Sequence, residues 1–345
     1  MGIANDLMRY FSPERIGQST ERNRPTLGTF LSDHPQHLPA TYVMSIINRL
    51  VIDCHMALVD HQWNFDLNGN CYQSFNYNPE LGAYGYYEYE THGFTKVHED
   101  FKGSIIPVIT YSVDHNIGTS FALQFGERVV LITAKHCVEN VGKVTIYDPN
   151  NNPVNPSRVH LPGKQDFPDG TYEYEYLDLA VLEFEPEFFV DRKPFIMSTP
   201  EILDPVLVMG YPPTGVFDSA SDVNAVLVSE TATIAHKYLK AVRGAQVAEG
   251  MLPSTKTNYI LVSARVKGGN SGGPVINKYG QVTGVITQVP GSGDSSDDEK
   301  LDELGFGFAI PTESLTLFLN SIYHGQDDII VDTRTPISLE DGFSI

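Results

Sequence analysis

A serine set among glycines carries the strongest chemical signal in the chain. Residues 268–275 read Gly-Gly-Asn-Ser-Gly-Gly-Pro-Val, with Ser271 near the middle. Glycine permits unusual backbone angles and a close approach of substrate, so the N–H groups around such a serine can turn inward and bind a developing oxyanion. Ser271 is therefore a candidate nucleophile, and a nucleophilic hydroxyl needs a base beside it.

Two residues upstream have the chemistry to activate that hydroxyl. His136 closely follows the apolar run of residues 129–134, and a histidine titrates in the range that a general base requires. Asp178 stands just before the apolar residues 179–182, where a carboxylate could hold the imidazole in the correct tautomer. Each residue alone has an ordinary alternative as a strand-end, turn or loop residue. The three together, in the order His, Asp, Ser, predict a catalytic triad.

The elements that would position these residues are strands. Short apolar or alternating runs separated by turn residues are typical of antiparallel barrels. Here they fall into two sets of about six, which predicts an all-β fold of two six-stranded antiparallel β-barrels. The first set covers residues 105–111, 119–125, 129–134, 143–147, 158–161 and 179–184, and the second covers 206–211, 224–231, 258–264, 274–277, 281–287 and 305–310. Residues 311–323 have helical periodicity and predict a C-terminal helix.

The same segments resemble those of the trypsin-like serine proteases, which have the chymotrypsin fold. Thr-Ala-Lys-His-Cys at residues 133–137 is similar to the family's histidine motif, and Asp-Leu-Ala at 178–180 is similar to its aspartate motif. Gly-Asn-Ser-Gly-Gly-Pro at 269–274 is similar to its nucleophile loop. Asn270 and the sequence Gly-Phe-Ala-Ile-Pro at 307–311 resemble the bacterial HtrA-type branch. The resemblance covers residues 104–323 and leaves residues 1–103 outside.

This resemblance implies a serine endopeptidase that hydrolyses protein or peptide substrates through an acyl-enzyme, with no cofactor and no metal. His136 and Asp178 would lie on the first barrel and Ser271 on the second, so the site would be the cleft between them. The backbone N–H groups of Gly269 and Ser271 would form the oxyanion hole.

The primary specificity pocket is also placed by the resemblance. Its floor would be Arg265, which either favours acidic side chains or, in the preferred interpretation, points outward along its strand. Its wall would include Thr287 and Val289, with Gly307 nearby. Val289 stands where relatives with an open pocket have glycine, so we expect a shallow pocket for a small or medium side chain.

Residues 1–103 are predicted to form a separate N-terminal extension of mixed structure. Residues 39–60 could hold an amphipathic helix. The aromatic-rich residues 71–94 are expected to pack as a sheet-like extension on the neighbouring barrel, in preference to forming a binding surface. The spacing of Cys54, His55, His61 and Cys71 fits no standard zinc pattern. The other expected boundaries are 104–190 for the first barrel, 191–323 for the second barrel with its helix, and 324–345 for an acidic tail.

Composition limits the partners and the location. The 345 residues carry a formal net charge of −20, which favours repulsion from nucleic acid and from anionic membranes. No signal peptide is visible at the start, and no run of about 18 apolar residues predicts a membrane span. In secreted relatives the cysteine after the histidine is paired, but residues 116–121, where its partner would lie, contain no cysteine. We therefore expect Cys137 to be a free thiol and the protein to be cytoplasmic, with no nucleic-acid or membrane partner.

Three functional hypotheses remain open. The chain could be an active endopeptidase, or a catalytically silent binding module that keeps the protease fold. It could also be a protease that is latent until an activating partner protein binds, with residues 1–103 or a separate protein as the switch. The acidic residues 291–304 would border the specificity pocket, and we interpret them as a solvated insertion rather than a regulatory loop.

Overall fold

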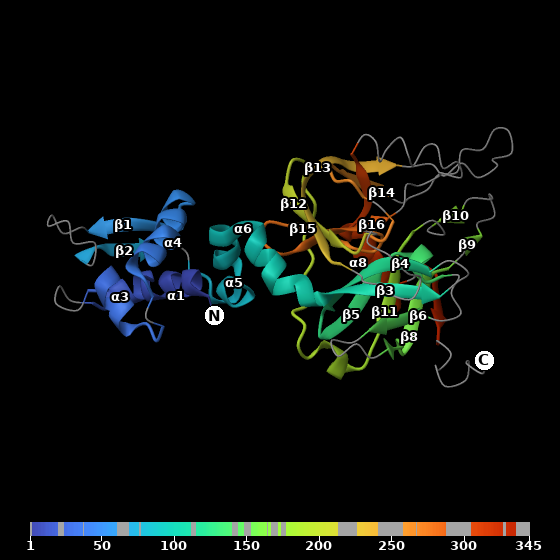
Figure 1. The fold of residues 1–345 in the computed structure, drawn as a ribbon, viewed down its shortest axis with the longest axis horizontal. Helices are drawn as coiled ribbons and strands as arrows, with labels where there is room; N and C mark the ends of the chain where they lie inside the picture. Colours follow the sequence, from blue (N-terminus) through green and yellow to red (C-terminus); the bar gives the residue numbers. More distant parts are fainter. Residues whose placement is uncertain are drawn as a thin grey trace. The chain divides into compact units, whose positions relative to one another are not determined.

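The chain is divided into two compact units, Met1–Val97 and His98–Ile345. The computed structural model in Figure 1 describes residues 2–19, 24–36, 38–60, 69–75, 77–111, 115–139, 144–147, 153–163, 165–166, 172–173, 177–212, 226–240, 258–266, 268–287, 305–326 and 329–335. Among these residues, no helix is long and apolar enough to span a membrane.

The N-terminal unit is mainly helical. It contains α1 (Ile3–Tyr10), α2 (Pro13–Gly17), α3 (Leu27–Asp33), α4 (Ala40–Ile52), α5 (Pro79–Tyr84) and most of α6 (Tyr86–Phe101), with β1 (Met56–Asp60) antiparallel to β2 (Cys71–Ser74). The last turn of α6 belongs to the second unit. Helix α4 lies within the region where the sequence allowed an amphipathic helix. Its buried residues Val43, Ile46, Ile47 and Leu50 recur at helical spacing, so one face of the helix packs in the core of this unit.

The aromatic segment does not form the predicted sheet-like extension. Only Cys71–Ser74 is a strand, and most of the segment is helical in α5 and α6. Asn78 caps α5 with its side-chain oxygen, and Gly85 ends it at a φ of 104°, a conformation that glycine adopts readily. Tyr72 and Tyr87 are buried in the core of the N-terminal unit. That prediction was wrong because Asn78 caps a helix and Gly85 ends it, so most of the segment adopts helical geometry. Its buried aromatic side chains then pack in the core of the N-terminal unit itself.

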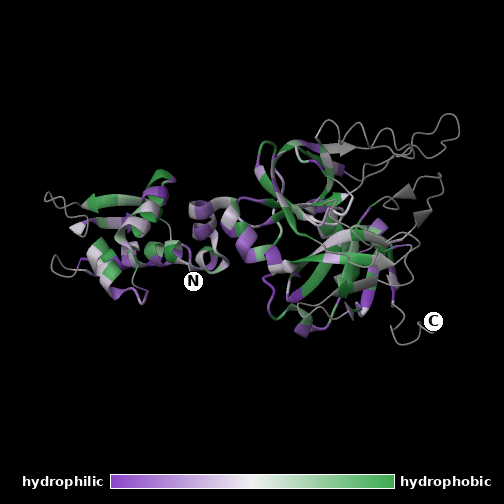
Figure 2. Ribbon diagram, in the orientation of Figure 1, coloured by the Kyte–Doolittle hydropathy of each residue, from purple (hydrophilic) through white to green (hydrophobic). Residues whose placement is uncertain are grey.

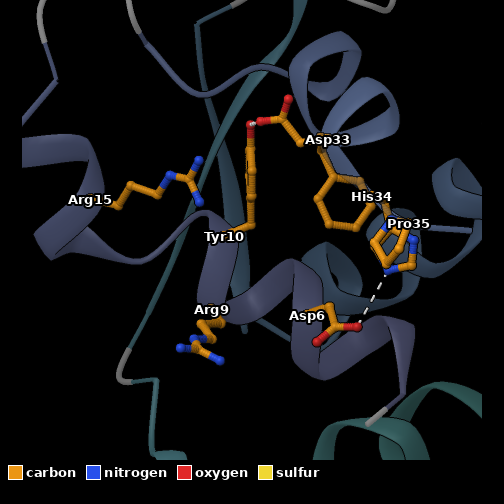
Figure 3. Close-up of a pocket in the computed structure, with 8 residues that line it drawn as sticks. Asp6, Arg9, Tyr10, Arg15, Asp33, His34 and Pro35 are labelled. Atoms are coloured by element: carbon orange, nitrogen blue, oxygen red, sulfur yellow. Dashed lines mark hydrogen bonds and ion pairs between the residues drawn. The ribbon is translucent and has the colours of Figure 1, made fainter.

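A pocket of about 320 Å³ lies among α1, α2 and α3 (Figure 3). The carboxylate of Asp6 lies 3.4 Å from Nε2 of His34. Asp33 accepts a hydrogen bond of 3.1 Å from the hydroxyl of Tyr10, and the guanidinium of Arg15 lies 3.8 Å from the centre of the Tyr10 ring. Most of the charged side chains around this pocket are therefore engaged with neighbouring side chains of the pocket.

The second unit contains a closed six-stranded barrel and an eight-stranded sheet. The barrel order is β12 (Pro205–Gly210), β13 (Val228–Lys240), β14 (Asn258–Val262), β17 (Gly307–Pro311), β16 (Val282–Thr287) and β15 (Pro274–Asn277). The sheet order is β18 (Val331–Arg334), β8 (Arg158–Pro162), β11 (Ala180–Glu183), β5 (Arg128–Thr133), β4 (His115–Phe125), β3 (Ile105–Tyr111), β6 (Val144–Tyr147) and β7 (Pro153–Val154). Figure 2 shows hydrophobic residues along many of these strands.

The remaining elements of this unit are short, apart from one helix. They are the hairpin of β9 (Gln165–Asp166) and β10 (Tyr172–Glu173), the 3-10 turns η2 (Lys102–Ser104), η3 (Lys135–Cys137) and η4 (Pro186–Phe189), and the helix α8 (Thr312–Tyr323). Helix α8 buries Leu315, Phe318 and Leu319, again at helical spacing.

The mostly β fold and one closed six-stranded barrel are confirmed, but the first predicted barrel differs from expectation. Within the described residues it is a sheet with β18 and β7 at its edges. Strand β18 follows α8 and pairs with β8, from Val331 opposite Pro162 to Arg334 opposite Val159. The sequence offered no strand signal there, because a four-residue segment with two charged residues resembles a polar tail.

Candidate active site

His136 and Asp178 lie close together because they flank the same end of two paired antiparallel strands. Strand β5 ends at Thr133, which pairs with Ala180 at the start of the antiparallel β11. The chain enters η3 directly after β5, and this turn contains His136. Asp178 lies two residues before β11, so the register of one strand pair brings the imidazole and the carboxylate together.

Two hydrogen bonds join this pair. Nδ1 of His136 lies 2.7 Å from Oδ2 of Asp178, and the backbone N–H of His136 donates to Oδ1 at 2.9 Å. The hydroxyl of Thr287, at the end of β16, also donates to Oδ2. The side chains of His136 and Asp178 are only 24% and 19% exposed. The carboxylate is thus oriented from both the sheet and the barrel, and Nε2 of the imidazole remains for other chemistry.

The electrostatics of the pair follow from burial and charge. Burial lowers the pKa of His136, but the hydrogen bond and the negative charge of Asp178 outweigh it and leave that pKa above its ordinary value. The neighbouring Cys137 adds to the rise. Burial raises the pKa of Asp178, but the hydrogen bond and charge of His136, together with the Thr287 hydroxyl, lower it overall. The pair therefore favours an ionised carboxylate beside an imidazole of increased basicity.

Ser271 lies in a tight loop that enters β15 at Pro274, and it is 7% exposed. Gly269 has a φ of 90°, and a Cβ there would lie 2.3 Å from the carbonyl oxygen of Tyr211. Gly272 has a φ of 84°, and a Cβ there would lie 2.2 Å from the carbonyl oxygen of Thr119. Both positions need glycine for its backbone freedom and for lack of space, as the sequence suggested for the loop around the serine.

The serine loop contacts the sheet that carries the other two residues. The carbonyl of Ser271 accepts a hydrogen bond of 2.8 Å from the N–H of Thr119 in β4. The same carbonyl lies 3.7 Å from Sγ of Cys137, the residue after His136. Between these described residues no hydrogen bond joins the His136 ring to the Ser271 hydroxyl. Such bonds in free enzymes are often long and tighten only when substrate binds.

The N–H groups of Gly269 and Ser271 have no acceptor among the described residues. Backbone donors that remain unpaired next to a serine hydroxyl can bind an anion. With the His136–Asp178 pair, the loop therefore has the parts for nucleophilic acyl transfer: a hydroxyl, a base oriented by a carboxylate, and two donors for an oxyanion.

The predicted pocket residues have different surroundings. Arg265 is exposed, in accord with the outward orientation that the sequence analysis preferred. Gly307 is buried at the start of β17, where a Cβ would lie 2.1 Å from Cγ2 of Val266. Thr287 is 3% exposed, and its side chain bonds to Asp178. Its side chain therefore contributes to the His136–Asp178 pair, and its place in the pocket wall stays a prediction. Val289 lies outside the described residues.

The sequence did not indicate Thr119 as a site residue, and it indicated Thr287 only as part of the pocket wall. Thr287 holds Asp178, and Thr119 contacts the serine loop through both its backbone and its side chain. Neither has a distinctive local motif, since threonine is common in strands. In the described part of the chain, no group of three or more His, Cys, Asp or Glu residues could hold a metal ion.

Comparisons with known proteins find similarity over part of the chain. Residues 118–285 match the family model of the trypsin-like peptidase domain. The chain is 29% identical to the serine endoprotease DegS of Salmonella typhimurium, over 42% of this chain and 35% of that protein. It is 31% identical to the serine protease Do-like HtrA of Lactococcus lactis, over 43% of this chain and 33% of that protein. Among solved structures it is similar to the Rv3671c protease of M. tuberculosis in its active form, at 18% identity, a TM-score of 0.46 and coverage of 66% of this chain and 84% of that one.

Residues 118–285 are therefore similar to a trypsin-like peptidase domain, and part of the chain is similar to HtrA-type serine endoproteases. The chain spans about a third of the length of these two curated relatives. The similarity to these relatives therefore does not by itself define the activity of the whole protein.

Proposed function

We propose that this protein is a serine endopeptidase with His136, Asp178 and Ser271 as its catalytic triad. The observation that carries the proposal is the doubly hydrogen-bonded His136–Asp178 pair, at 2.7 and 2.9 Å, next to a serine loop that requires glycine on both sides. A carboxylate that bonds both the ring and the backbone of one histidine fixes the ring orientation, as a general base needs.

The mechanism follows from the positions of these groups. Oγ of Ser271 attacks the carbonyl carbon of the scissile peptide bond, and its proton passes to Nε2 of His136. The tetrahedral oxyanion is bound by the N–H groups of Gly269 and Ser271. The C–N bond then breaks, and His136 gives the proton to the leaving amine. Water, deprotonated by His136, hydrolyses the acyl ester and restores the Ser271 hydroxyl. The substrates are proteins or peptides, and the chemistry uses no cofactor.

Covalent labelling tests the triad directly. A fluorophosphonate probe should label the full chain at Ser271, the label should be lost in Ser271→Ala, and it should be strongly reduced in His136→Ala. Ser45→Ala is the matched control, because Ser45 is an exposed residue of α4 that bonds only the carbonyl of Tyr42, and it should label like the unchanged protein. Absence of labelling in the unchanged protein, with or without added protein partners, would leave the silent binding module as the better hypothesis.

We further propose that the enzyme is latent until a partner protein binds. The motivation is the cytoplasmic location expected from the sequence, because a protease inside a cell needs control over its activity. The role of the N-terminal unit can be tested by comparing casein cleavage by the full chain and by a chain that begins after Gly93. Gly93 interrupts α6 with a φ of 62°, and this cut keeps Phe101, whose ring stacks 4.2 Å from that of Phe195. Equal activity would exclude inhibition by the N-terminal unit.

A further inference from the structure

Thr119 is a fully buried residue whose polar groups all bond segments of the candidate site. Its N–H donates to the carbonyl of Ser271 at 2.8 Å. Its hydroxyl lies 2.6 Å from the carbonyl oxygen of Gly269, and it accepts a hydrogen bond of 3.0 Å from the N–H of Tyr211. Its own carbonyl accepts from the hydroxyl of Thr133 at 2.7 Å. One residue of β4 thus joins the serine loop to the chain that follows β12.

The strand register explains why the backbone of Thr119 is available for this. Strand β4 pairs with β5 only as far as Ser120 opposite Thr133. Thr119 comes next along β4, beyond the last residue of β5, so its N–H and C=O have no strand partner on that side. The buried backbone groups still need partners, and the Ser271 carbonyl and the Thr133 hydroxyl supply them.

The direction of the hydroxyl bond is set by its neighbours. The Tyr211 N–H can only donate, so Oγ1 of Thr119 must accept from it. The single hydroxyl proton of Thr119 then goes to the Gly269 carbonyl. This bond restrains the peptide plane between Gly269 and Asn270, and the bond from the Thr119 N–H restrains the plane between Ser271 and Gly272. Each of these planes directly follows a residue whose N–H group would bind the oxyanion, so each bond limits the rotation of that residue about its Cα–C bond.

Gly269 needs such a restraint more than other residues do. At a φ of 90° it occupies one of several backbone conformations that have similar energy for glycine. Its peptide planes could therefore rotate and turn an N–H group away. Preorganised donors cost nothing at the moment of reaction, whereas donors that must be reoriented weaken the stabilisation of the oxyanion.

We propose that the Thr119 hydroxyl is a positioning group that holds the Gly269 peptide in the conformation of an oxyanion hole. This inference rests on the proposed protease function, because it assigns a role within that reaction. Thr119 does not touch the reacting atoms. It acts through Gly269, so its loss should reduce kcat and leave KM nearly unchanged.

The test compares Thr119→Val, which keeps the side-chain shape but removes the hydroxyl, with Thr119→Ser, which keeps the hydroxyl. The full chain is assayed for cleavage of a quenched-fluorescent casein, with active sites counted by the fluorophosphonate probe. Loss of a complete oxyanion donor costs about 10²–10³ in kcat, so a loosened donor should cost about 10- to 100-fold in Thr119→Val. Thr119→Ser should stay within about threefold of the unchanged protein.

Thr283→Val is the matched control for simple destabilisation. Thr283 is a fully buried barrel threonine whose hydroxyl also donates to a backbone carbonyl, that of Val275 at 3.2 Å. It should lose thermal stability with an unchanged kcat per active site. If Thr119→Val does not fold, Thr119→Ala replaces it under the same expectations.

Three results would overturn the inference: a Val variant within threefold of the unchanged kcat, a Ser variant as slow as the Val variant, or a change confined to KM. Failure of the proposed function is seen separately, because the unchanged protein would then neither bind the probe nor cleave casein.

Discussion

At the scale of single residues, the candidate site depends on one ion pair within hydrogen-bond distance. Asp178 is partly buried and receives bonds from the ring and backbone of His136 and from Thr287. A carboxylate that is largely removed from water is costly unless it is paired. Asp178 and His136 are therefore interdependent, because the charge state of each group shifts the pKa of the other.

We expect Asp178→Asn to lower kcat by about 10⁴, the loss known for this change in other serine proteases, and to lower the pKa of His136. Asp178 raises that pKa while burial lowers it, so removing the charge leaves burial dominant. Since the base must be neutral to act, the acid limb of the pH–rate profile should move to lower pH. NMR titration of the imidazole provides the direct measurement. Thr287→Val, which removes a donor without changing the charge, should shift the profile less, and an unmoved acid limb in Asp178→Asn would contradict this account.

Cys137 supplies a second residue-scale prediction. It is a free thiol, and a Cβ built on Gly118 would lie 3.2 Å from its Cβ and 2.6 Å from its Sγ. Disulfides need a Cβ–Cβ distance of about 3.5–4.5 Å, so Gly118→Cys should form one after a shift of a few tenths of an ångström. Closing a loop of this length should stabilise the fold by about 3 kcal/mol.

The measurement for this disulfide is the melting temperature with and without reductant. The variant Gly118→Cys with Cys137→Ser is the control, and it should show no dependence on reductant. The chain has three free cysteines, so the single variant has four. Four free thiols by mass spectrometry in the oxidised single variant would refute the geometry, whereas two are expected when the disulfide forms.

At the scale of elements, the docking of β18 on β8 encloses a buried histidine. The side chain of His160 is 6% exposed. Its Nδ1 lies 2.9 Å from Oγ1 of Thr333 in β18, and its Nε2 lies 3.3 Å from Oε1 of Glu183 without hydrogen-bond geometry. The hydroxyl of Tyr323 donates to the same Glu183 oxygen at 2.8 Å. The final strand is therefore tied to the sheet by side chains as well as by its backbone ladder.

His160 should make the stability of this unit sensitive to acid. Burial lowers its pKa in the folded state, whereas in the unfolded chain it titrates near about 6.5. The unfolded state therefore takes up the proton first, and the free energy of unfolding should fall as pH drops through about 6.5. His160→Gln should flatten the dependence of melting temperature on pH in this range, while His236→Gln, at an exposed position, should not. A steeper dependence in His160→Gln would show that the histidine is stabilised by protonation instead.

At the scale of the whole molecule, the chain forms two compact units, and the candidate triad residues all belong to the second. The N-terminal unit has its own hydrophobic core, which includes Leu7, Phe11, Phe30, Ile47 and Tyr72. Residues 118–285, which match the trypsin-like peptidase domain, lie in the second unit, together with all three candidate triad residues. No candidate triad residue lies in the N-terminal unit.

We expect residues 1–97 to fold without the rest of the chain. A core closed by its own helices and hairpin meets the requirement for independent folding. The separate unit should give a helical circular dichroism spectrum and a cooperative thermal transition. Replacing the fully buried Phe11 by Ala should lower the stability by about 3–5 kcal/mol, whereas replacing the exposed Ile52 should change it little. A non-cooperative melt would contradict the division into two units.

Much of the second unit could be read from the chain in advance. Apolar alternation predicted the strands, because a strand must bury one face whatever its partners are. Local motifs predicted the environments of His136, Asp178 and Ser271, since a strand end and a glycine turn are set by the neighbouring residues. The helices of the aromatic segment were not predicted even though Asn78 and Gly85 carried local signals, because aromatic residues are enriched in strands and their number favoured a sheet-like interpretation.

Other features could be settled only by the fold itself. Thr287 and Asp178 are 109 residues apart, and Thr119 and Gly269 are 150 residues apart. A threonine in a strand looks the same in sequence whether its hydroxyl meets water, a carboxylate or a strained peptide. The same holds for β18, whose polar residues become a strand only because β8 offers an unpaired edge. Partners at such separations are chosen by register and packing, which are properties of the assembled chain rather than of any segment.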